Sequence, residues 1–251
     1  MLDRIISSFE SIPKVAGHFD IYVLERQIQR QFDYFEGSKK LYVYLPHWGD
    51  GLGYLKNLRK VILERKQSII AYGFPRKVLS SDWRLTLDCF ETLRANVQAD
   101  ILRLKNKYGF SEIIVLANSL GCVHACMVAN RDPIINKLYL LTPGHDLAES
   151  MWHGLRTQFL RREFENRGTD LMQLKKHWHD LAPENNLNLK GVETHIYLSR
   201  SDQIIPYRFG AQLVENMQRL GIDPQVRINN HLGHYGTIAA FYLFPGKFLT
   251  V

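Results

Sequence analysis

The chain has 251 residues, and its hydrophobic (45%) and charged (23%) fractions are ordinary for a globular protein of one domain. Its three cysteines are an odd number, which argues against a disulfide framework and favours a reducing compartment, so we expect a cytoplasmic protein. No apolar run approaches membrane-spanning length, and the first residues lack the pattern of a signal peptide. We therefore expect neither a transmembrane segment nor a signal peptide.

A formal net charge of +7 raises the question of nucleic-acid binding, but the basic residues are scattered along the chain. The densest group lies at 56–66, where Lys56, Arg59 and Lys60 share one face of a predicted helix. We interpret this group as a solvated helix face and expect no nucleic-acid partner. The sequence leaves open whether the helix binds an acidic partner, and it does not determine the oligomeric state.

The N-terminal part begins with a predicted short amphipathic helix over 2–10 and a predicted strand over 19–24. The pattern over 25–40 does not distinguish strand from helix. From residue 40 onward, short apolar runs alternate with helical patterns, which predicts a mostly parallel central sheet with helices on both faces. The strands are expected at 41–45, 68–72, 113–117, 137–141, 194–198 and 225–228, and the helices within 51–65 and over 81–107, 120–130 and 206–220. The stretch 81–107 is expected to be one long helix or two in succession, with Ser80 or Ser81 as the cap and Gly109 after the end.

The strand predicted at 113–117 leads into Ala117-Asn118-Ser119-Leu120-Gly121, in which small residues stand two before and two after a serine. A serine at the apex of a sharp strand-to-helix turn has a strained backbone, and its neighbours at i−2 and i+2 are pressed together. Only small side chains fit there, and the turn exposes the serine hydroxyl at the end of the sheet.

This pentapeptide resembles the nucleophile elbow of the α/β-hydrolase superfamily, whose usual form is Gly-x-Ser-x-Gly, with Ala117 in place of the first glycine. The resemblance implies a single α/β-hydrolase domain over 1–251 and, in the serine hydrolase branch, a Ser-Asp-His triad in that chain order. Because the nucleophile position is Ser rather than Asp, the epoxide-hydrolase and dehalogenase branches are not expected.

The triad needs a base and an acid after the serine. Asp202 follows the predicted strand 194–198 and precedes a helix with Pro206 at its start, which resembles the family's acid loop. His234 follows the last predicted strand in a Gly-His pair that matches the family's base. We predict that Ser119, Asp202 and His234 are catalytic. His231 is a less favoured candidate for the base. Asp146, which follows the earlier strand 137–141, is a rival for the acid, although capping of a helix also explains it.

The oxyanion hole requires two N–H donors directed at the carbonyl oxygen as it becomes charged. One is expected from the backbone of Leu120, directly after the nucleophile. The other is expected from the loop after strand 41–45, where Pro46-His47-Trp48-Gly49 resembles the family's His-Gly-x-Gly loop with its first pair altered. That alignment makes Trp48 the second donor.

Residues 145–190 interrupt the alternation with two helical patterns, and an insertion at this point resembles the helical lid of α/β-hydrolases. Its apolar residues predict a pocket for an apolar acyl group of medium length rather than for a charged group. The predicted pocket residues are Met151, Trp152, Leu155 and Trp178.

The resulting hypothesis is a serine hydrolase that cleaves a carboxylic ester of a small-molecule acyl substrate through an acyl-enzyme intermediate. Thioester cleavage and carbon–carbon bond hydrolysis on the same triad are alternatives, and so is a hydrolase-like binding protein with little turnover. No cofactor is expected, because the chain has no Walker loop and no glycine-rich dinucleotide fingerprint. No metal site is expected either, because His177 and His179 lie two apart on a predicted helix and point away from each other.

Overall fold

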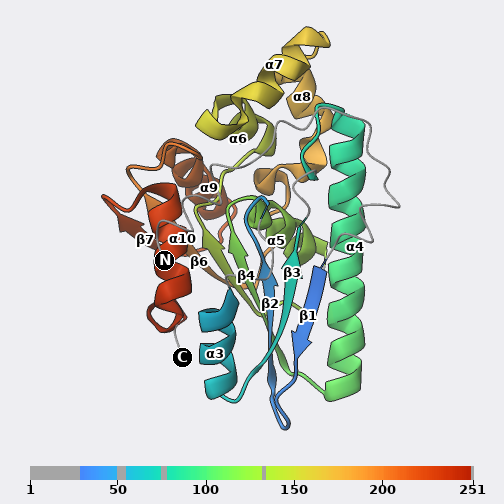
Figure 1. Cartoon of the computed structure of the whole chain (residues 1–251), viewed down its shortest axis with the longest axis vertical. Coiled ribbons are helices and arrows are strands. Elements are labelled where there is room, and N and C mark those ends of the chain that lie inside the picture. Colours follow the sequence, from blue (N-terminus) through green and yellow to red (C-terminus); the bar gives the residue numbers. More distant parts are fainter. Residues whose placement is uncertain (1–28, 50–54, 75–77, 132–133, 250–251) are drawn as a thin grey trace.

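The computed structural model describes residues 29–49, 55–74, 78–131 and 134–249 (Figure 1). The helix predicted over 2–10 and the strand predicted over 19–24 lie outside these residues. None of the helices in the described ranges is long and apolar enough to span a membrane.

The centre of the described molecule is a seven-stranded sheet with the strand order β1-β3-β2-β4-β5-β6-β7. Only β1 is antiparallel to its neighbour, and every other pairing is parallel. Six strands agree with the predicted ones to within one or two residues, and β1 lies in the part of the chain where the pattern was ambiguous. The strands are β1 (Gln29–Asp33), β2 (Lys40–Leu45), β3 (Ser68–Gly73), β4 (Glu112–Asn118), β5 (Lys137–Leu141), β6 (Glu193–Ser199) and β7 (Gln225–Asn229).

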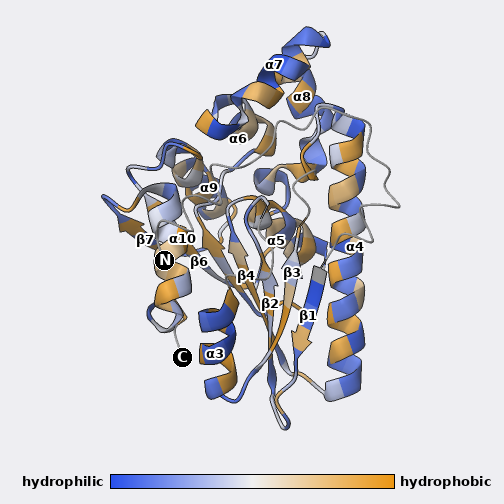
Figure 2. Ribbon diagram, in the orientation of Figure 1, coloured by the Kyte–Doolittle hydropathy of each residue, from blue (hydrophilic) through white to orange (hydrophobic). Residues whose placement is uncertain are grey.

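Alternation along β2 divides the apolar core between the two faces of the sheet. Leu41, Val43 and Leu45 belong to one buried cluster, which also contains residues of α4 (Trp83–Tyr108), α5 (Leu120–Arg131) and α9 (Tyr207–Arg219). Tyr42 and Tyr44 belong to a second cluster, which contains residues of α3 (Lys56–Glu64) and α10 (Gly233–Leu243). Successive strand residues point to opposite faces, so one strand packs against both helical layers. Figure 2 shows the apolar strands between helices whose outer faces are hydrophilic, while the edge strand β1 is mostly hydrophilic.

The long helix α4 is one continuous helix, and it begins at Trp83, two residues after Ser81 and three after Ser80, the two serines predicted as its cap. The carboxylate of Asp82 accepts a hydrogen bond from the Arg84 N–H at 3.0 Å and is therefore the cap, in place of Ser80 or Ser81. At the other end, Gly109 has a left-handed φ of 70°, as expected for a glycine that ends a helix.

The basic helix α3 buries Leu58 and Ile62 and turns its charged residues outward. One of these is bound to the sheet: Arg59 forms two hydrogen bonds, of 2.7 and 2.6 Å, with the carboxylate of Asp33 on β1. Lys60 pairs with Glu64 along the exposed face of the helix.

The chain between β5 and β6 forms a helical insertion that lies beyond one end of the sheet (Figure 1). It consists of α6 (Leu147–His153), η3 (Leu155–Thr157), α7 (Gln158–Asn166), α8 (Leu171–His177), η4 (His179–Leu181) and η5 (Pro183–Asn185).

The strand register brings several loops to this same end of the sheet. Leu45 pairs with Ala117, so the loops after β2 and β4 leave the sheet side by side. Ser199 pairs with Asn229, which does the same for the loops after β6 and β7. In a parallel sheet these carboxyl ends form the usual crevice for a functional site.

Candidate active site

Ser119 occupies the sharp turn between β4 and α5. Its φ of 52° lies in the left-handed region, which a serine adopts only when its surroundings impose it. The Ser119 N–H donates to the carbonyl of Leu141 at 2.8 Å, and the Ser119 carbonyl accepts from the Cys122 N–H at 2.9 Å. These backbone bonds hold the strained turn with its hydroxyl directed away from the sheet.

The glycine two residues after Ser119 is required by a close backbone contact. A Cβ atom on Gly121 would lie 2.3 Å from the carbonyl oxygen of Leu45 and 2.5 Å from that of Pro46. The start of α5 is thereby packed against the end of β2. Ala117, where the family's usual form has glycine, is fully buried within β4, so this position accommodates one methyl group.

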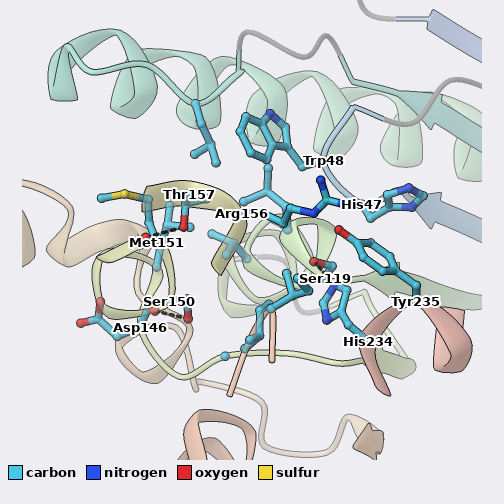
Figure 3. Close-up of a pocket in the computed structure, with 17 residues that line it drawn as sticks. His47, Trp48, Ser119, Asp146, Ser150, Met151, Arg156, Thr157, His234 and Tyr235 are labelled. Atoms are coloured by element: carbon cyan, nitrogen blue, oxygen red, sulfur yellow. Dashed lines mark hydrogen bonds between the residues drawn. The ribbon is translucent and has the colours of Figure 1, made fainter. Parts of the chain in front are cut away.

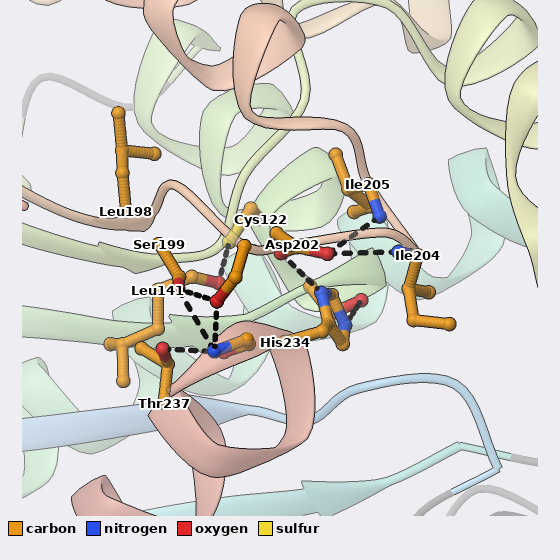
Figure 4. A network of polar contacts seen from close by, with 12 residues as sticks. Cys122, Leu141, Leu198, Ser199, Asp202, Ile204, Ile205, His234 and Thr237 are labelled. Atoms are coloured by element: carbon orange, nitrogen blue, oxygen red, sulfur yellow. Dashed lines mark hydrogen bonds and ion pairs between the residues drawn. The ribbon is translucent and has the colours of Figure 1, made fainter. Parts of the chain in front are cut away.

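The hydroxyl of Ser119 lies at the cleft end of a hydrogen-bonded chain whose other members, His234 and Asp202, are buried. Ser119 Oγ is 3.0 Å from His234 Nε2, and His234 Nδ1 is 2.8 Å from Asp202 Oδ2. The other oxygen of Asp202 accepts from the N–H groups of Ile204 and Ile205 at 2.9 and 3.0 Å (Figure 4). The structure thus brings together the three residues predicted to be catalytic, from three loops that are far apart in the sequence.

The carboxylate determines which nitrogen of His234 carries the hydrogen. Ionised Asp202 can only accept hydrogen bonds, so His234 Nδ1 must donate to it. In the neutral imidazole, Nε2 is then unprotonated and accepts from the hydroxyl of Ser119. This is the tautomer in which a histidine can take a proton from the serine.

A cluster of polar groups fixes the loop that precedes His234. Gly233 has a left-handed φ of 62°, and its N–H lies 2.9 Å from Ser199 Oγ and 3.1 Å from Ser201 Oγ. The Asn229 side chain donates to the Leu198 carbonyl and to Thr237 Oγ1, both at 3.0 Å. These bonds connect the ends of β6 and β7 to α10, so the sheet itself positions the imidazole.

Ser119 and His234 open into a cleft with about 730 Å³ of empty space, part of it open to solvent (Figure 3). Its walls are mostly apolar and come from the loop after β2, from α5, from the insertion and from the loop that contains Asp202. The apolar residues that line it are Trp48, Leu79, Leu120, Val123, Leu147, Met151, Ile204 and Ile205.

The fold matches solved structures, although sequence identity to them is low. An acetyl xylan esterase from Paenibacillus sp. R4 superposes with a TM-score of 0.67 at 12% identity, over 99% of this chain and 93% of that one. An esterase of Pyrococcus furiosus gives a TM-score of 0.60 at 13% identity, over 94% and 93% of the two chains. A carboxyl esterase from the fungus Tuber melanosporum gives 0.62 at 18%, over 88% and 81%. The chain has the α/β-hydrolase fold. No protein-family model and no curated protein sequence matches it.

Within this α/β-hydrolase fold, Trp48 and Leu120, the two predicted oxyanion donors, both line the cleft beside Ser119. Gly49, directly after Trp48, has a left-handed φ of 76°. The Trp48 indole stacks on the Phe159 ring of the insertion, with 6.3 Å between the ring centroids. Their neighbour His47 is buried. Burial, with a smaller repulsion from His234, lowers the pKa of His47 to about 3, so this imidazole is neutral at pH 7.

The rival residues have other surroundings in the structure. Asp146 caps α6 by accepting from the Glu149 N–H at 2.9 Å, and its second oxygen lies 3.4 Å from Lys175 Nζ. It lines the cleft, but the carboxylate in contact with His234 belongs to Asp202. His231 is exposed on the surface.

Of the four predicted pocket residues, only Met151 lines the cleft. Trp178 is buried inside the insertion, where its indole N–H donates to the Trp83 carbonyl at 3.0 Å. Trp152 also belongs to the buried core, and Leu155 is 55% exposed to solvent. These three residues do not line this cleft, because Trp152 and Trp178 pack into the buried core and Leu155 faces solvent, a difference that helical periodicity does not show.

Several polar residues that line the cleft were not found from the sequence, among them Arg156 and Tyr235. Arg156 lies on η3 and Tyr235 lies in the first turn of α10, and both line the cleft (Figure 3). Tyr235 directly follows His234, and this position next to the predicted base could have indicated that it lines the cleft. Arg156 directly follows Leu155, which was predicted to line the pocket. In the part of the chain that the structure describes, no group of three or more His, Cys, Asp or Glu side chains could hold a metal ion.

Proposed function

We propose that this chain is a serine hydrolase that cleaves carboxylic esters through an acyl-enzyme on Ser119. The hydrogen-bonded sequence Ser119–His234–Asp202, opening into a mostly apolar cleft, is the observation that carries the proposal. A serine hydroxyl becomes nucleophilic when a histidine in the correct tautomer can accept its proton. The esterases among the structural neighbours are consistent with this chemistry.

In the proposed reaction, Ser119 Oγ attacks the ester carbonyl carbon while His234 Nε2 takes the hydroxyl proton. The N–H groups of Leu120 and Trp48 stabilise the negative oxygen of the tetrahedral intermediate. The intermediate collapses, the alcohol leaves with the proton from His234, and the acyl group remains on Ser119. Water, deprotonated by His234, then attacks the acyl-enzyme, and the carboxylic acid leaves as Ser119 recovers its proton. Asp202 keeps the imidazole oriented and stabilises its charged form throughout.

The acyl group is proposed to bind against the apolar wall formed by Leu79, Val123, Leu147 and Met151. Leu147 and Met151 belong to α6, so the helical insertion over 145–190 is proposed to act as a lid over the acyl site. A series of p-nitrophenyl esters and of acyl thioesters with increasing chain length would separate ester from thioester cleavage. We expect esters of medium acyl length to be the better substrates.

A neutral fluorophosphonate probe tests the proposal directly, because it reacts with activated serines and mimics the tetrahedral intermediate. We expect stoichiometric labelling of Ser119 at neutral pH and loss of labelling in both Ser119→Ala and His234→Ala. Ser119→Ala should lower ester turnover by about 10⁶-fold. Labelling should slow in acid, because a protonated imidazole cannot accept the hydroxyl proton.

Ser150→Ala is the matched control. Ser150 lines the same cleft, but its hydroxyl donates to the Asp146 carbonyl at 2.6 Å and has no histidine base. This variant should label like the wild type. A folded wild-type protein that resists the probe while its cleft still binds acyl ligands would instead be a binding protein, and the proposed hydrolase activity would be wrong.

A further inference from the structure

The cleft contains one strongly basic side chain. Among the described residues that line it, Arg156 is the only lysine or arginine, and it lies on the same cleft as Ser119. Figure 3 shows the guanidinium directed into the cleft, toward His47 and Tyr235 and on the side of Ser119. His47 is neutral at pH 7 because burial lowers its pKa to about 3, so it adds no charge there.

The turn that carries Arg156 is tightly held. A Cβ atom on Gly154 would lie 2.6 Å from the Ser150 carbonyl oxygen and 2.9 Å from that of Ile204, so this position has no space for a side chain. The hydroxyl of Thr157 hydrogen-bonds to the carbonyl of Met151 and lies 3.2 Å from that of Gly154. The two residues on either side of the turn therefore fix its backbone, and Arg156 projects from a positioned turn rather than from a free loop.

No carboxylate in the described part of the chain lies within ion-pair distance of Arg156. The acid that lines the cleft, Asp146, is paired with Lys175, and Glu149 pairs with the same lysine. Asp202 is occupied by His234 and by two backbone N–H groups. Arg156 is half-buried, and its guanidinium interacts with the Tyr235 hydroxyl. That hydroxyl is neutral, so no acid in contact balances the charge of the guanidinium.

The groups beside Arg156 also favour an anion. The guanidinium carbon lies 5.8 Å from the centre of the Tyr235 ring, and burial raises the pKa of the Tyr235 hydroxyl, which keeps it protonated at neutral pH. A protonated phenol can donate a hydrogen bond, and a guanidinium presents paired donors that match the two oxygens of a carboxylate.

We propose that Arg156 binds a carboxylate of the ester substrate, so that the enzyme prefers esters carrying a negative charge within reach of the scissile carbonyl. This inference rests on the proposed function and narrows its substrate class to amphipathic esters with an apolar segment and one carboxylate. It departs from the expectation, drawn from the composition of the insertion, that the substrate is uncharged.

Matched ester pairs test the proposal at neutral pH. Monoethyl adipate against diethyl adipate places the charge on the acyl side, and the butyrate ester of glycolic acid against that of glycolamide places it on the alcohol side. In at least one pair, we expect the wild type to prefer the charged ester by about 10- to 100-fold in kcat/KM, the usual effect of a hydrogen bond to a charged group. The pair that responds identifies the side on which the carboxylate binds.

Arg156→Gln should remove this preference by lowering kcat/KM for the charged ester alone, and Arg156→Lys should retain part of it. Arg156→Glu should reverse it and favour butyrylcholine over the anionic esters. Arg161→Gln is the matched control, because Arg161 belongs to the same insertion but pairs with Glu165 at 2.8 Å and does not line the cleft. This variant should behave like the wild type.

Labelling of Ser119 by the neutral fluorophosphonate separates the two possible failures. If the wild type is not labelled, the proposed hydrolase activity itself fails. Suppose instead that the wild type and all the Arg156 and Arg161 variants are labelled at the same rate, but the wild type shows no preference for the charged ester of either pair. The role of Arg156 is then overturned, and the hydrolase proposal stands. Equal losses on charged and neutral esters in Arg156→Gln would likewise overturn it.

Discussion

At the scale of single residues, two aspartates follow neighbouring strands of the sheet but have different surroundings. Asp202 lies 2.8 Å from His234 and accepts two backbone hydrogen bonds, whereas Asp146 caps α6 and pairs with Lys175. Sequence order alone left both as candidates for the acid. The contact with His234 favours Asp202.

Substituting each aspartate by asparagine tests this assignment. Asp202→Asn should lower kcat by about 10⁴-fold, because the amide can hold His234 in the wrong tautomer. Asp146→Asn should be nearly silent, because asparagine is also a good helix cap. Steady-state kinetics on one ester, with circular dichroism to verify folding, measures both. A large loss in Asp146→Asn alone would transfer the acid role to the earlier strand.

Two adjacent residues of the insertion, Leu155 and Arg156, have opposite surroundings. Leu155 was predicted to line the pocket and is instead 55% exposed, while Arg156 lines it. The backbone is extended at Gly154, with φ −69° and ψ 136°, and the 3-10 turn η3 begins after it. This break ends the helical periodicity of α6, so the pattern of α6 cannot be extended through it.

At the scale of elements, the start of α5 contacts the end of β2 through backbone atoms. Gly121 permits this contact, since its Cα is next to the carbonyl groups of Leu45 and Pro46. The same contact connects the turn of Ser119 to the loop that contains Trp48. The elbow and the proposed oxyanion loop are therefore coupled by packing.

Gly121→Ala should disturb both elements together. The added methyl group would overlap the carbonyl of Leu45, so we expect a destabilisation of about 1–3 kcal/mol or more, together with reduced ester turnover. Gly246→Ala is the matched control, because the nearest atom to an added Cβ there is the flexible guanidinium of Arg65 at 3.6 Å. Urea unfolding and kinetics on both variants measure the effect. A Gly121→Ala protein with unchanged stability and turnover would contradict this coupling.

At the scale of the whole molecule, two buried histidines connect folding stability to pH. His124 is fully buried on α5, where its ring stacks on Phe90 at 4.1 Å and lies 4.7 Å from Phe74. Burial lowers its pKa from 6.5 to about 3, and the same cause acts on His47. Between pH 3 and pH 6.5, approximately the folded and unfolded pKa values of both histidines, the unfolded chain binds protons that the folded chain does not. The free energy of unfolding should therefore fall as the pH drops from about 6.5 toward 3.

His124→Leu should reduce this dependence on pH. One proton taken up on unfolding contributes a slope of up to about 1.4 kcal/mol per pH unit, and the variant should lose the share that belongs to His124. Unfolding free energies from urea titrations between pH 7 and pH 4 measure the slope. Phe90→Leu disturbs the same packing without removing a titratable group, so it should keep the wild-type slope. An unchanged slope in His124→Leu would mean that this histidine is not held neutral by burial.

Six of the seven strands and the candidate residues Ser119, Asp202 and His234 could be predicted from the sequence, whereas the edge strand β1 could not. Apolar strands and glycines such as Gly109 and Gly121 follow from local rules, namely burial on both faces of a parallel sheet and backbone positions that exclude a side chain. Most of the cleft lining became visible only from the packing of the elements. The tertiary structure separated Asp202 from Asp146 through one contact across the sheet, and it selected Arg156 rather than Leu155 through a turn that interrupts helical periodicity. A side chain's partners come from elements that are distant in the sequence, whereas periodicity describes one element only.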